Sequence, residues 1–413
     1  MTHTAAENVQ ELVTTSAQVT PQSGWQAGYD KGFAVALWRL PRQTDKRLIV
    51  NLNRDIPRVK ANLEDLPAGF VVSPFLNLDA TDSLFIEADL YFRFDEKNEI
   101  LTEQSAVTNE NTSVTDWLKQ TTQRLRTPRQ TTQKLRASLP EPQTKNDYQT
   151  LVQTAIEAIE AGKMQKVVLS RNNQIEWPDD LCFTEVFERL CQKYPNAFVS
   201  LVYLPQLQQV WLGATPEILV SVDEAGVFRT VSLAGTQSAL GADGQPISPK
   251  HATWTQKEIE EQAFVSRYII ECFKKIRVRE FVEEGPKTVI AGNLMHLRTD
   301  YTVDTKAINF PEMGSVMLEL LHPTSAVCGM PKFASLQFIQ EHEGYHREFY
   351  SGFLGPVNVE NASHLFVNLR CMKVQEGVAT LYAGGGITED SVPEKEWQET
   401  ELKMQTMLAV LNP

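Results

Sequence analysis

Short apolar runs separated by turn residues dominate this chain, and they do not alternate with helical segments in a βαβ order. Residues 21 to about 100 contain FAVALWRL, RLIVNL, GFVVSPF and SLFIEADLYFRF. Alternation within such runs, with Pro, Gly and Asn between them, predicts β-strands. The phosphate-binding patterns GxGxxG and GxxxxGK[ST] are both absent. The order therefore predicts a mixed antiparallel α+β protein and disfavours a mononucleotide-binding α/β sheet.

The later part of the chain is more densely apolar. Helical spacing after Asp147, ending at Gly162, predicts a helix with a C-terminal glycine. A long helix is expected over about 255–275, and another from Pro393 to Leu411, where proline followed by acidic residues suits a helix start. Strands are predicted for 166–171, 196–204, 209–214, 217–222, 227–236, 349–357, 364–374 and 379–386.

The 413 residues suggest two or three domains or one large α+β body. We expect a polar N-terminal tail over 1–20 and an N-terminal part of the fold over 21–146. The latter includes a connector at about 102–146, rich in Thr, Gln, Ser and charge, with too few apolar residues to bury a face. Residues 147–413 form the denser region in which the chemistry is expected.

Composition restricts the possible partners. The net charge of −13 gives no general attraction to phosphate backbones or anionic lipid, so nucleic acid and membrane surfaces are not expected partners. A small anionic substrate in a locally basic pocket stays possible. The polar N-terminus does not resemble a signal peptide, and no apolar stretch is long enough for a membrane span. The five cysteines show neither disulfide nor zinc spacing. We therefore expect a cytoplasmic protein.

Two pairs of glutamates stand three residues apart, Glu258 with Glu261 and Glu396 with Glu399. Residues three apart share a helix face, and Lys403 joins the face of the second pair. Mg²⁺ binds oxygen ligands, commonly one or two carboxylates completed by water and substrate oxygens. The two pairs could supply such a site, although an E-x-x-E pair is more often a solvated acidic face.

Two charged residues border apolar strands. Lys166 opens the run KVVLSR, where a lysine must be desolvated, paired, or able to reach solvent from the strand end. A desolvated neutral amine can act as a general base. Glu217, in GATPE, is either a buried acid with a raised pKa or a strand-entry residue in water. The residues alone leave both choices open.

Three further features are open to a functional and a structural interpretation. Gly384, Gly385 and Gly386 follow a strand and could form an anion-binding nest or a flexible tight turn. Arg370, within the predicted strand HLFVNLRCM, would be a costly buried charge unless an anion pairs with it. His322 precedes a proline, which favours an extended backbone, and a single histidine is more often structural than catalytic.

Nine segments, in this order, resemble those of the chorismate-utilising enzymes, most closely the isochorismate synthases. They span roughly residues 147–410: KVVLSR, GATPE, LAGT, KEIEEQ, LHPTSAVCGMP, HREFYSGFLG, LFVNLR, YAGGGI and EKEWQETELK. The resemblance implies a two-lobed, anthranilate-synthase-like α+β fold, with large antiparallel sheets around a central cleft and helices outside. It also implies an isomerase that uses Mg²⁺ to convert chorismate into isochorismate for menaquinone or siderophore synthesis.

Roles carry over by motif. The resemblance implies that Lys166 activates water for attack at C2 of the ring and that Glu217 protonates the departing C4 hydroxyl. It further implies that Glu261 and Glu399 ligate Mg²⁺, with Glu258 and Glu396 beside them. The groups that would hold or line the substrate site are Gly235, Thr236, His322, Tyr350, Arg370, Gly384, Gly385, Gly386 and Lys403.

Two positions separate the relatives. Enzymes of this family that use ammonia typically carry glutamine in place of Lys166, and one group carries a nucleophilic lysine in place of Ala234. The residues present favour water as the nucleophile and no glutaminase subunit. A salicylate synthase, which adds pyruvate elimination, and a non-catalytic chorismate-binding homologue are the alternatives. Gly385, Gln262 and Gln237 depart from the family's usual residues without removing a proposed catalytic group.

Overall fold

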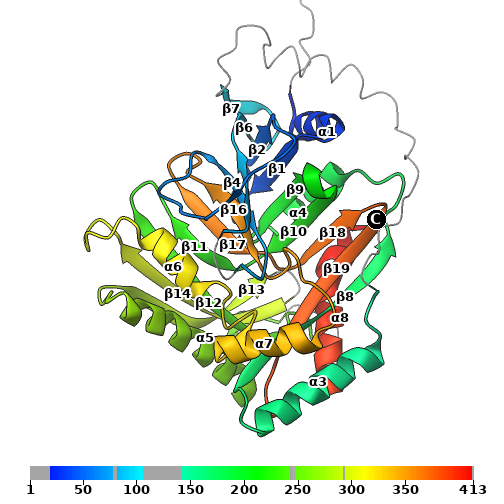
Figure 1. Cartoon of the computed structure of the whole chain (residues 1–413), viewed down its shortest axis with the longest axis vertical. Coiled ribbons are helices and arrows are strands. Elements are labelled where there is room, and N and C mark those ends of the chain that lie inside the picture. The colour runs from blue at the N-terminus through cyan, green and yellow to red at the C-terminus, as the bar shows by residue number, and fades with distance from the viewer. Residues whose placement is uncertain are drawn as a thin grey trace, which may run out of the picture.

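Two large antiparallel sheets form the body of the protein (Figure 1). The computed structural model describes residues 19–77, 81–105, 141–241, 245, 247–291 and 294–411. Within these residues one sheet has ten strands and the other nine, and seven α-helices accompany them. The α+β prediction is confirmed. No helix of the described residues is long and apolar enough to cross a membrane.

The ten-stranded sheet contains strands from both ends of the sequence. Its order is β15 (Gly329–Met330), β8 (Lys166–Glu176), β19 (Val378–Ile387), β18 (Cys371–Gln375), β10 (Gln209–Thr215), β9 (Phe198–Leu204), β1 (Ala34–Arg39), β2 (Lys46–Asn51), β6 (Leu90–Phe94) and β7 (Ile100–Ser105). The order of the nine-stranded sheet is β13 (Val282–Ala291), β14 (Leu294–Asp304), β12 (Val227–Ser238), β11 (Ile218–Val222), β17 (Ser363–Val367), β16 (Phe353–Val357), β4 (Gly69–Ser73), β5 (Ser83–Glu87) and β3 (Arg58–Val59).

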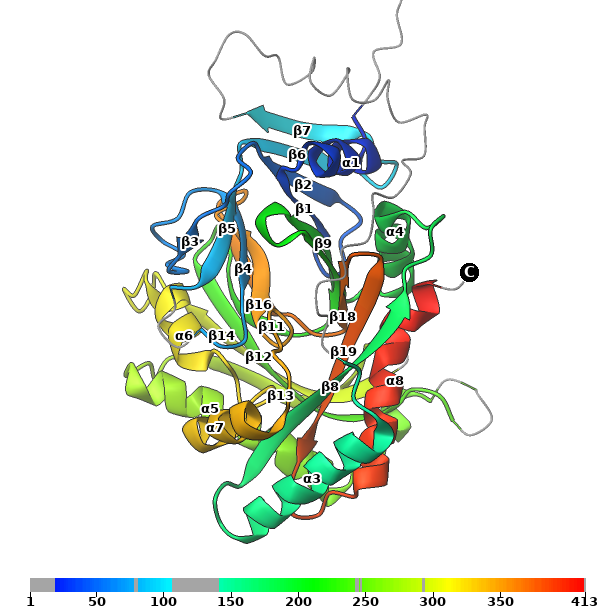
Figure 2. The same ribbon diagram turned by 45° about the vertical axis from the view of Figure 1, so that its right-hand side comes forward.

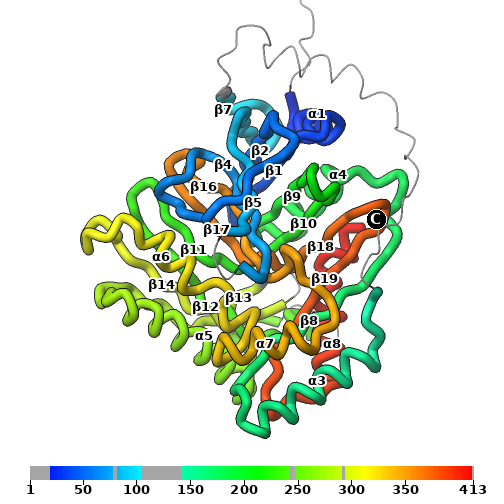
Figure 3. The backbone as a smooth tube through the Cα atoms, viewed as in Figure 1, coloured from blue at the N-terminus to red at the C-terminus, as the bar shows by residue number. Residues whose placement is uncertain are grey.

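Residues from the N-terminal part of the chain complete both sheets. Strand β1 pairs with β9 in one sheet, and β4 pairs with β16 in the other, where Figure 3 shows the blue and orange segments side by side. The N-terminal strands therefore share their sheets with the later part of the chain. Most of the polar tail predicted for 1–20 and of the connector predicted for 102–146 lies outside the described residues.

The core has an inner layer and two outer layers. Where the sheets face each other, aromatic rings interlock, and Phe198 and Phe366 stack with centroids 4.1 Å apart. Outside the ten-stranded sheet lie α1 (Pro21–Lys31), α4 (Phe183–Lys193) and α8 (Pro393–Leu411). Outside the nine-stranded sheet lie α5 (Gln256–Lys275) and α6 (Met313–Leu321). Helices α3 (Lys145–Glu160) and α7 (Lys332–His342) pack on β8 of the ten-stranded sheet (Figure 2).

Local signals set the helix ends. Gly162, just past α3, adopts φ 76°, as expected of a C-terminal glycine, because a residue without Cβ enters the left-handed region at little cost. Helix α8 begins at Pro393 with acidic residues in its first turn, as predicted. Thr255 and Glu258 form a reciprocal capping box at the start of α5. These helices matter for function because α5 and α8 carry the glutamate pairs.

Candidate active site

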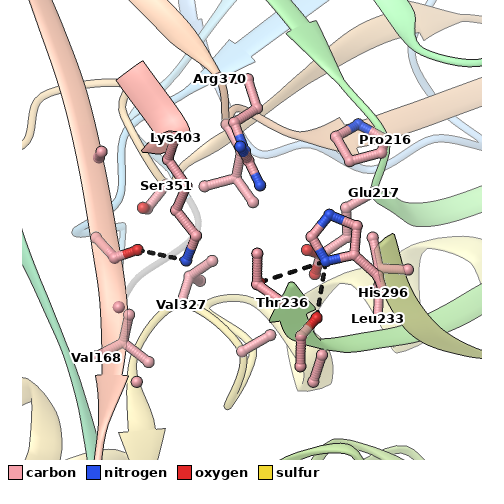
Figure 4. A pocket seen from close by; sticks show the side chains of 18 of the residues that line it. Val168, Pro216, Glu217, Leu233, Thr236, His296, Val327, Ser351, Arg370 and Lys403 are labelled. Carbon is pink, nitrogen blue, oxygen red and sulfur yellow. Dashed lines mark hydrogen bonds between the residues drawn. The ribbon is translucent and has the colours of Figure 1, made fainter. Parts of the chain in front are cut away.

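One cavity gathers most of the predicted site residues (Figure 4). Its walls come from both sheets, from α5 and α8, and from two connections between the sheets. Ten predicted residues line it: Glu217, Gly235, Thr236, Glu261, Tyr350, Arg370, Gly384, Gly385, Gly386 and Lys403. Five others do not: Lys166, Glu258, His322, Glu396 and Glu399. Ala234, at the position where one group of the ammonia-using enzymes carries a lysine, also lines the cavity.

Glu217 and Arg370 lie where the chain crosses from one sheet to the other. Glu217 stands between β10 and β11, and Arg370 between β17 and β18, with φ 49°. The crossings are joined because Val367 N–H donates to the Glu217 carbonyl and Ala214 N–H donates to the Arg370 carbonyl, both at 3.0 Å. The prediction of a single strand over 364–374 is therefore wrong, since the chain changes sheets within that apolar run.

Glu217 is a buried acid, which decides between its two interpretations. Its exposed fraction is 5%, and burial raises its pKa to about 8 although Lys166, Arg370 and Lys403 favour the charged form. The carboxyl group is therefore largely protonated near neutral pH. A protonated acid facing a cavity can give its proton to a leaving group.

Lys166 lies behind the cavity wall. The residue is fully buried, and its Nζ donates to Glu261 Oε1 at 2.9 Å. Burial alone would disfavour the charged form of Glu261, but Lys166, with Lys403 and Lys257, holds its pKa at about 2. The other Glu261 oxygen accepts a hydrogen bond from Gly235 N–H at 3.2 Å. Lys166 is thus paired, one of the possibilities open from its sequence.

Gly384–Gly386 form neither a nest nor a turn, whereas the strand predicted over 379–386, which includes them, is confirmed. They lie within β19 and pair regularly with β8. A Cβ on Gly386 would lie 2.7 Å from both Glu261 Oε1 and Lys166 Cε, and a Cβ on Gly385 would lie 3.2 Å from Glu396 Oε2. The missing side chains therefore let carboxylates pack directly against the strand.

Helix α8 brings two acids and a lysine next to β19. Glu399 pairs with Lys403 at 2.6 Å, and Lys403 also donates to the Gly384 carbonyl at 2.7 Å (Figure 4). Glu396 is almost fully buried and pairs with Lys257 of α5 at 2.5 Å. Sequence reasoning missed Lys257, because nothing in the sequence shows that the first turn of α5 meets the first turn of α8.

The acids of α5 and α8 fit a hard divalent cation. Glu396 Oε2 is buried without a hydrogen-bond partner among the described residues, next to Gly385, and a Cβ on Gly385 would also lie 3.9 Å from Glu399 Oε1. Among the described residues, no three acidic, histidine or cysteine side chains are placed so that together they could bind one metal ion. Mg²⁺ needs only one or two carboxylates, with waters and substrate oxygens completing its octahedron. Glu261 and Glu399 can provide them.

Glu258 has a different role from the other three glutamates of the two pairs. Its carboxylate accepts hydrogen bonds from the Thr255 backbone N–H at 2.7 Å and from the Thr255 hydroxyl at 2.9 Å. It therefore caps α5 and does not turn toward the other acids.

His322 lies away from the cavity. Its ring packs edge-on against Phe353, and its Nε2 is 3.2 Å from the Pro74 carbonyl. The substrate-facing role carried over by motif is not supported, and the structural interpretation fits better. The histidine that lines the cavity is His296 of β14, which sequence reasoning missed. A polar residue between the apolar Met295 and Leu297 was the only sequence signal.

The fold, the paired sheets and this cavity define a class of protein. A model of the family "chorismate binding enzyme" matches residues 79–412. The chain belongs to that family, as its motifs suggested.

Within this family, the chain is similar to several individual proteins. Isochorismate synthase EntC of Escherichia coli (strain K12) is 31% identical over 278 residues, covering 67% of this chain and 68% of the relative. The structure of MenF, the menaquinone-specific isochorismate synthase from Escherichia coli, superimposes with a TM-score of 0.68 at 20% identity, covering 92% of this chain and 89% of MenF. Anthranilate synthase component I from Streptococcus pneumoniae TIGR4 gives 0.65 at 20% identity, with 90% and 89% covered. The anthranilate-synthase-like fold class is confirmed.

Proposed function

We propose that this chain is an isochorismate synthase, which converts chorismate into isochorismate. The observation that carries the proposal is a single cavity combining a protonated acid, Glu217, with the Arg370 guanidinium and with Glu261, which pairs with Lys166 behind the wall. The likeness to a relative named isochorismate synthase supports it. The product would serve menaquinone or siderophore synthesis.

The reaction exchanges a hydroxyl at C4 of the ring for one at C2. Lys166 takes a proton from a water molecule as the water oxygen bonds to C2. The C1=C2 and C5=C6 double bonds become C1=C6 and C4=C5, and the C4–O bond breaks as Glu217 gives its proton to the departing oxygen. One water enters and one leaves. The proton then passes from Lys166 back to Glu217 through solvent, which resets both groups.

Lys166 must lose its proton before it can act as a base. In the structure the amine is paired with Glu261, which is also a proposed ligand of Mg²⁺. Bound Mg²⁺ would supply positive charge that neutralises Glu261, Glu399 and a substrate carboxylate.

Chorismate carries two carboxylates, and the cavity offers cations to hold them. Arg370 makes no ion pair within the described residues, and its guanidinium points into the cavity (Figure 4). Burial lowers its pKa to about 10, which leaves it charged near neutral pH. Lys403 approaches the same space from α8. A planar guanidinium can hold a carboxylate through two hydrogen bonds, so Arg370 is the principal anchor.

The product distribution tests the function. With chorismate and Mg²⁺ near neutral pH, we expect isochorismate to dominate and to approach a reversible equilibrium with chorismate, as separated by chromatography. A lactate-dehydrogenase-coupled assay should detect little pyruvate, and ammonium salts should yield little aminated product, since Lys166 and Ala234 both differ from the ammonia-using pattern. Salicylate with an equal amount of pyruvate would make the chain a salicylate synthase, and no product at all would make it a binding homologue.

Divalent cations are expected to be required. Adding EDTA should abolish turnover, and excess Mg²⁺ should restore it. In calorimetry without substrate, Glu261→Gln should bind Mg²⁺ more weakly than the unchanged chain, because a neutral amide is a poorer ligand for a hard dication. Glu258→Gln is the matched control on the same helix and should keep its Mg²⁺ affinity. Full turnover in EDTA would contradict the metal assignment.

A further inference from the structure

His296 is held in the cavity wall by one of its two ring nitrogens. The residue lies on β14, with an exposed fraction of 5%, and its Nδ1 is 2.8 Å from the Gly235 carbonyl oxygen (Figure 4). A carbonyl oxygen only accepts hydrogen bonds, so Nδ1 carries the hydrogen and donates it. The Thr236 hydroxyl, 3.4 Å from the same nitrogen, lies on the same side of the ring.

The other nitrogen is left as a bare acceptor. Burial and the nearby Arg370 lower the pKa of His296 to about 3, so the ring is neutral near pH 7 and Nε2 has a free lone pair. Nε2 is buried and has no hydrogen-bond partner among the described residues. Buried acceptors without partners are uncommon and costly, which points to a donor that the free chain does not contain.

The proposed substrate has one such donor. Near neutral pH both carboxylates of chorismate are ionised and only accept hydrogen bonds, as does its ether oxygen. The hydroxyl at C4 is its single hydrogen-bond donor. Elsewhere the cavity presents Arg370 and Lys403, which suit the carboxylates, while both oxygens of its Glu261 carboxylate already accept hydrogen bonds, from Lys166 and from Gly235 N–H. Nε2 of His296, which as a neutral ring nitrogen can only accept, therefore matches this donor, whereas the Tyr382 hydroxyl, also in the lining and without a partner among the described residues, can donate as well.

We infer that Nε2 of His296 accepts a hydrogen bond from the C4 hydroxyl of the bound substrate and selects for its presence. The inference rests on the proposed function and adds a specificity-determining residue to it. A hydroxyl that gives its hydrogen to His296 directs its oxygen lone pairs elsewhere. Glu217, whose carboxyl group points into the same cavity, can then deliver its proton to that oxygen (Figure 4). His296 thus orients the group that leaves.

Binding of two unreactive ligands tests this. One is 5,6-dihydrochorismate, which lacks the second double bond that the reaction needs, and the other is its 4-deoxy form. The unchanged chain with Mg²⁺ should bind the hydroxylated ligand about tenfold to a hundredfold more tightly by calorimetry. His296→Asn keeps an amide donor for the Gly235 carbonyl but has no atom at the position of Nε2. In this variant the ratio of the two affinities should fall close to one.

His296→Gln is the complementary variant, because its amide oxygen can replace Nε2 while support for Gly235 is lost. It should keep part of the preference for the hydroxylated ligand. If the role of His296 were purely structural, both variants would bind both ligands more weakly by the same factor. The ratio of the two affinities would then stay unchanged, and that result would overturn the inference. If protonated Glu217 donates to Nε2, the ratio of the two affinities should be near one in the unchanged chain. That result would also overturn the inference. If neither ligand binds and chorismate is not converted, the proposed function itself fails.

Discussion

Replacing Lys166 by alanine is expected to lower kcat by a factor of about 10²–10⁴, the usual effect of removing a general base. The amine is the only part of the side chain that can take the proton of the attacking water, and its buried position leaves little room for solvent to replace it. Turnover of chorismate, followed by chromatography of isochorismate, measures the effect.

Two comparisons separate chemistry from folding. Lys163→Ala removes an exposed lysine at the turn before the same strand and should leave kcat unchanged. Lys166→Ala also deprives Glu261 of its counter-ion, so thermal unfolding of each variant must be measured alongside its activity. A folded Lys166→Ala protein that turns over at a near-normal rate would place the base elsewhere.

The sequence predicts the local elements well because their signals are local. The limits of α8 follow from a proline and acidic residues at its start, and the end of α3 from one glycine. Strand order could not be predicted in this way. The pairing of β1 with β9 or of β4 with β16 joins residues far apart in the chain, and such pairing depends on the sheets as wholes.

The site shows the same division. Glutamates three apart on α5 and α8 were recognisable by spacing, but Glu258 proved to be a helix cap and Lys257 a partner of Glu396. The sequence pattern predicts Arg370 inside a strand because the apolar run continues without interruption where the chain changes sheets. A sequence pattern reports burial and period, and it does not report which of two sheets a residue joins.

The two histidines illustrate a third limit. His322 stands in a family motif and His296 in an ordinary strand, yet only His296 lines the cavity. What distinguishes them is their place in the fold: His322 packs against Phe353, whereas His296 has Nδ1 at the Gly235 carbonyl and leaves Nε2 without a partner among the described residues. That information exists only once β12 and β14 are paired.

Glu217→Gln is expected to lower kcat by about 10²–10⁴, comparable to the loss of Lys166, because an amide cannot give a proton to the departing oxygen. The change preserves the size of the side chain, so the cavity should keep its shape and its affinity for the unreactive dihydro ligand. Glu224→Gln, an exposed acid in the turn after β11, is the matched control and should leave kcat unchanged. Normal turnover by a folded Glu217→Gln protein would show that another group protonates the leaving oxygen.

The pH profile gives an independent test of the same carboxyl group. Burial raises the pKa of Glu217 from its ordinary value of 4.5 to about 8, so the protonated, active form should disappear as the pH rises through about 8, and kcat/KM should fall there. Stability should change in the same direction. The native state holds a proton that the unfolded chain releases above pH 4.5, so the contribution of Glu217 is complete below pH 4.5. It is lost as the pH rises toward 8, by at most about 1.4 kcal/mol per pH unit.

Glu217→Gln should remove this dependence of stability on pH, as measured by thermal or denaturant unfolding at a series of pH values. A slope unchanged by the substitution would mean that Glu217 is ionised in the native protein and could not serve as the acid.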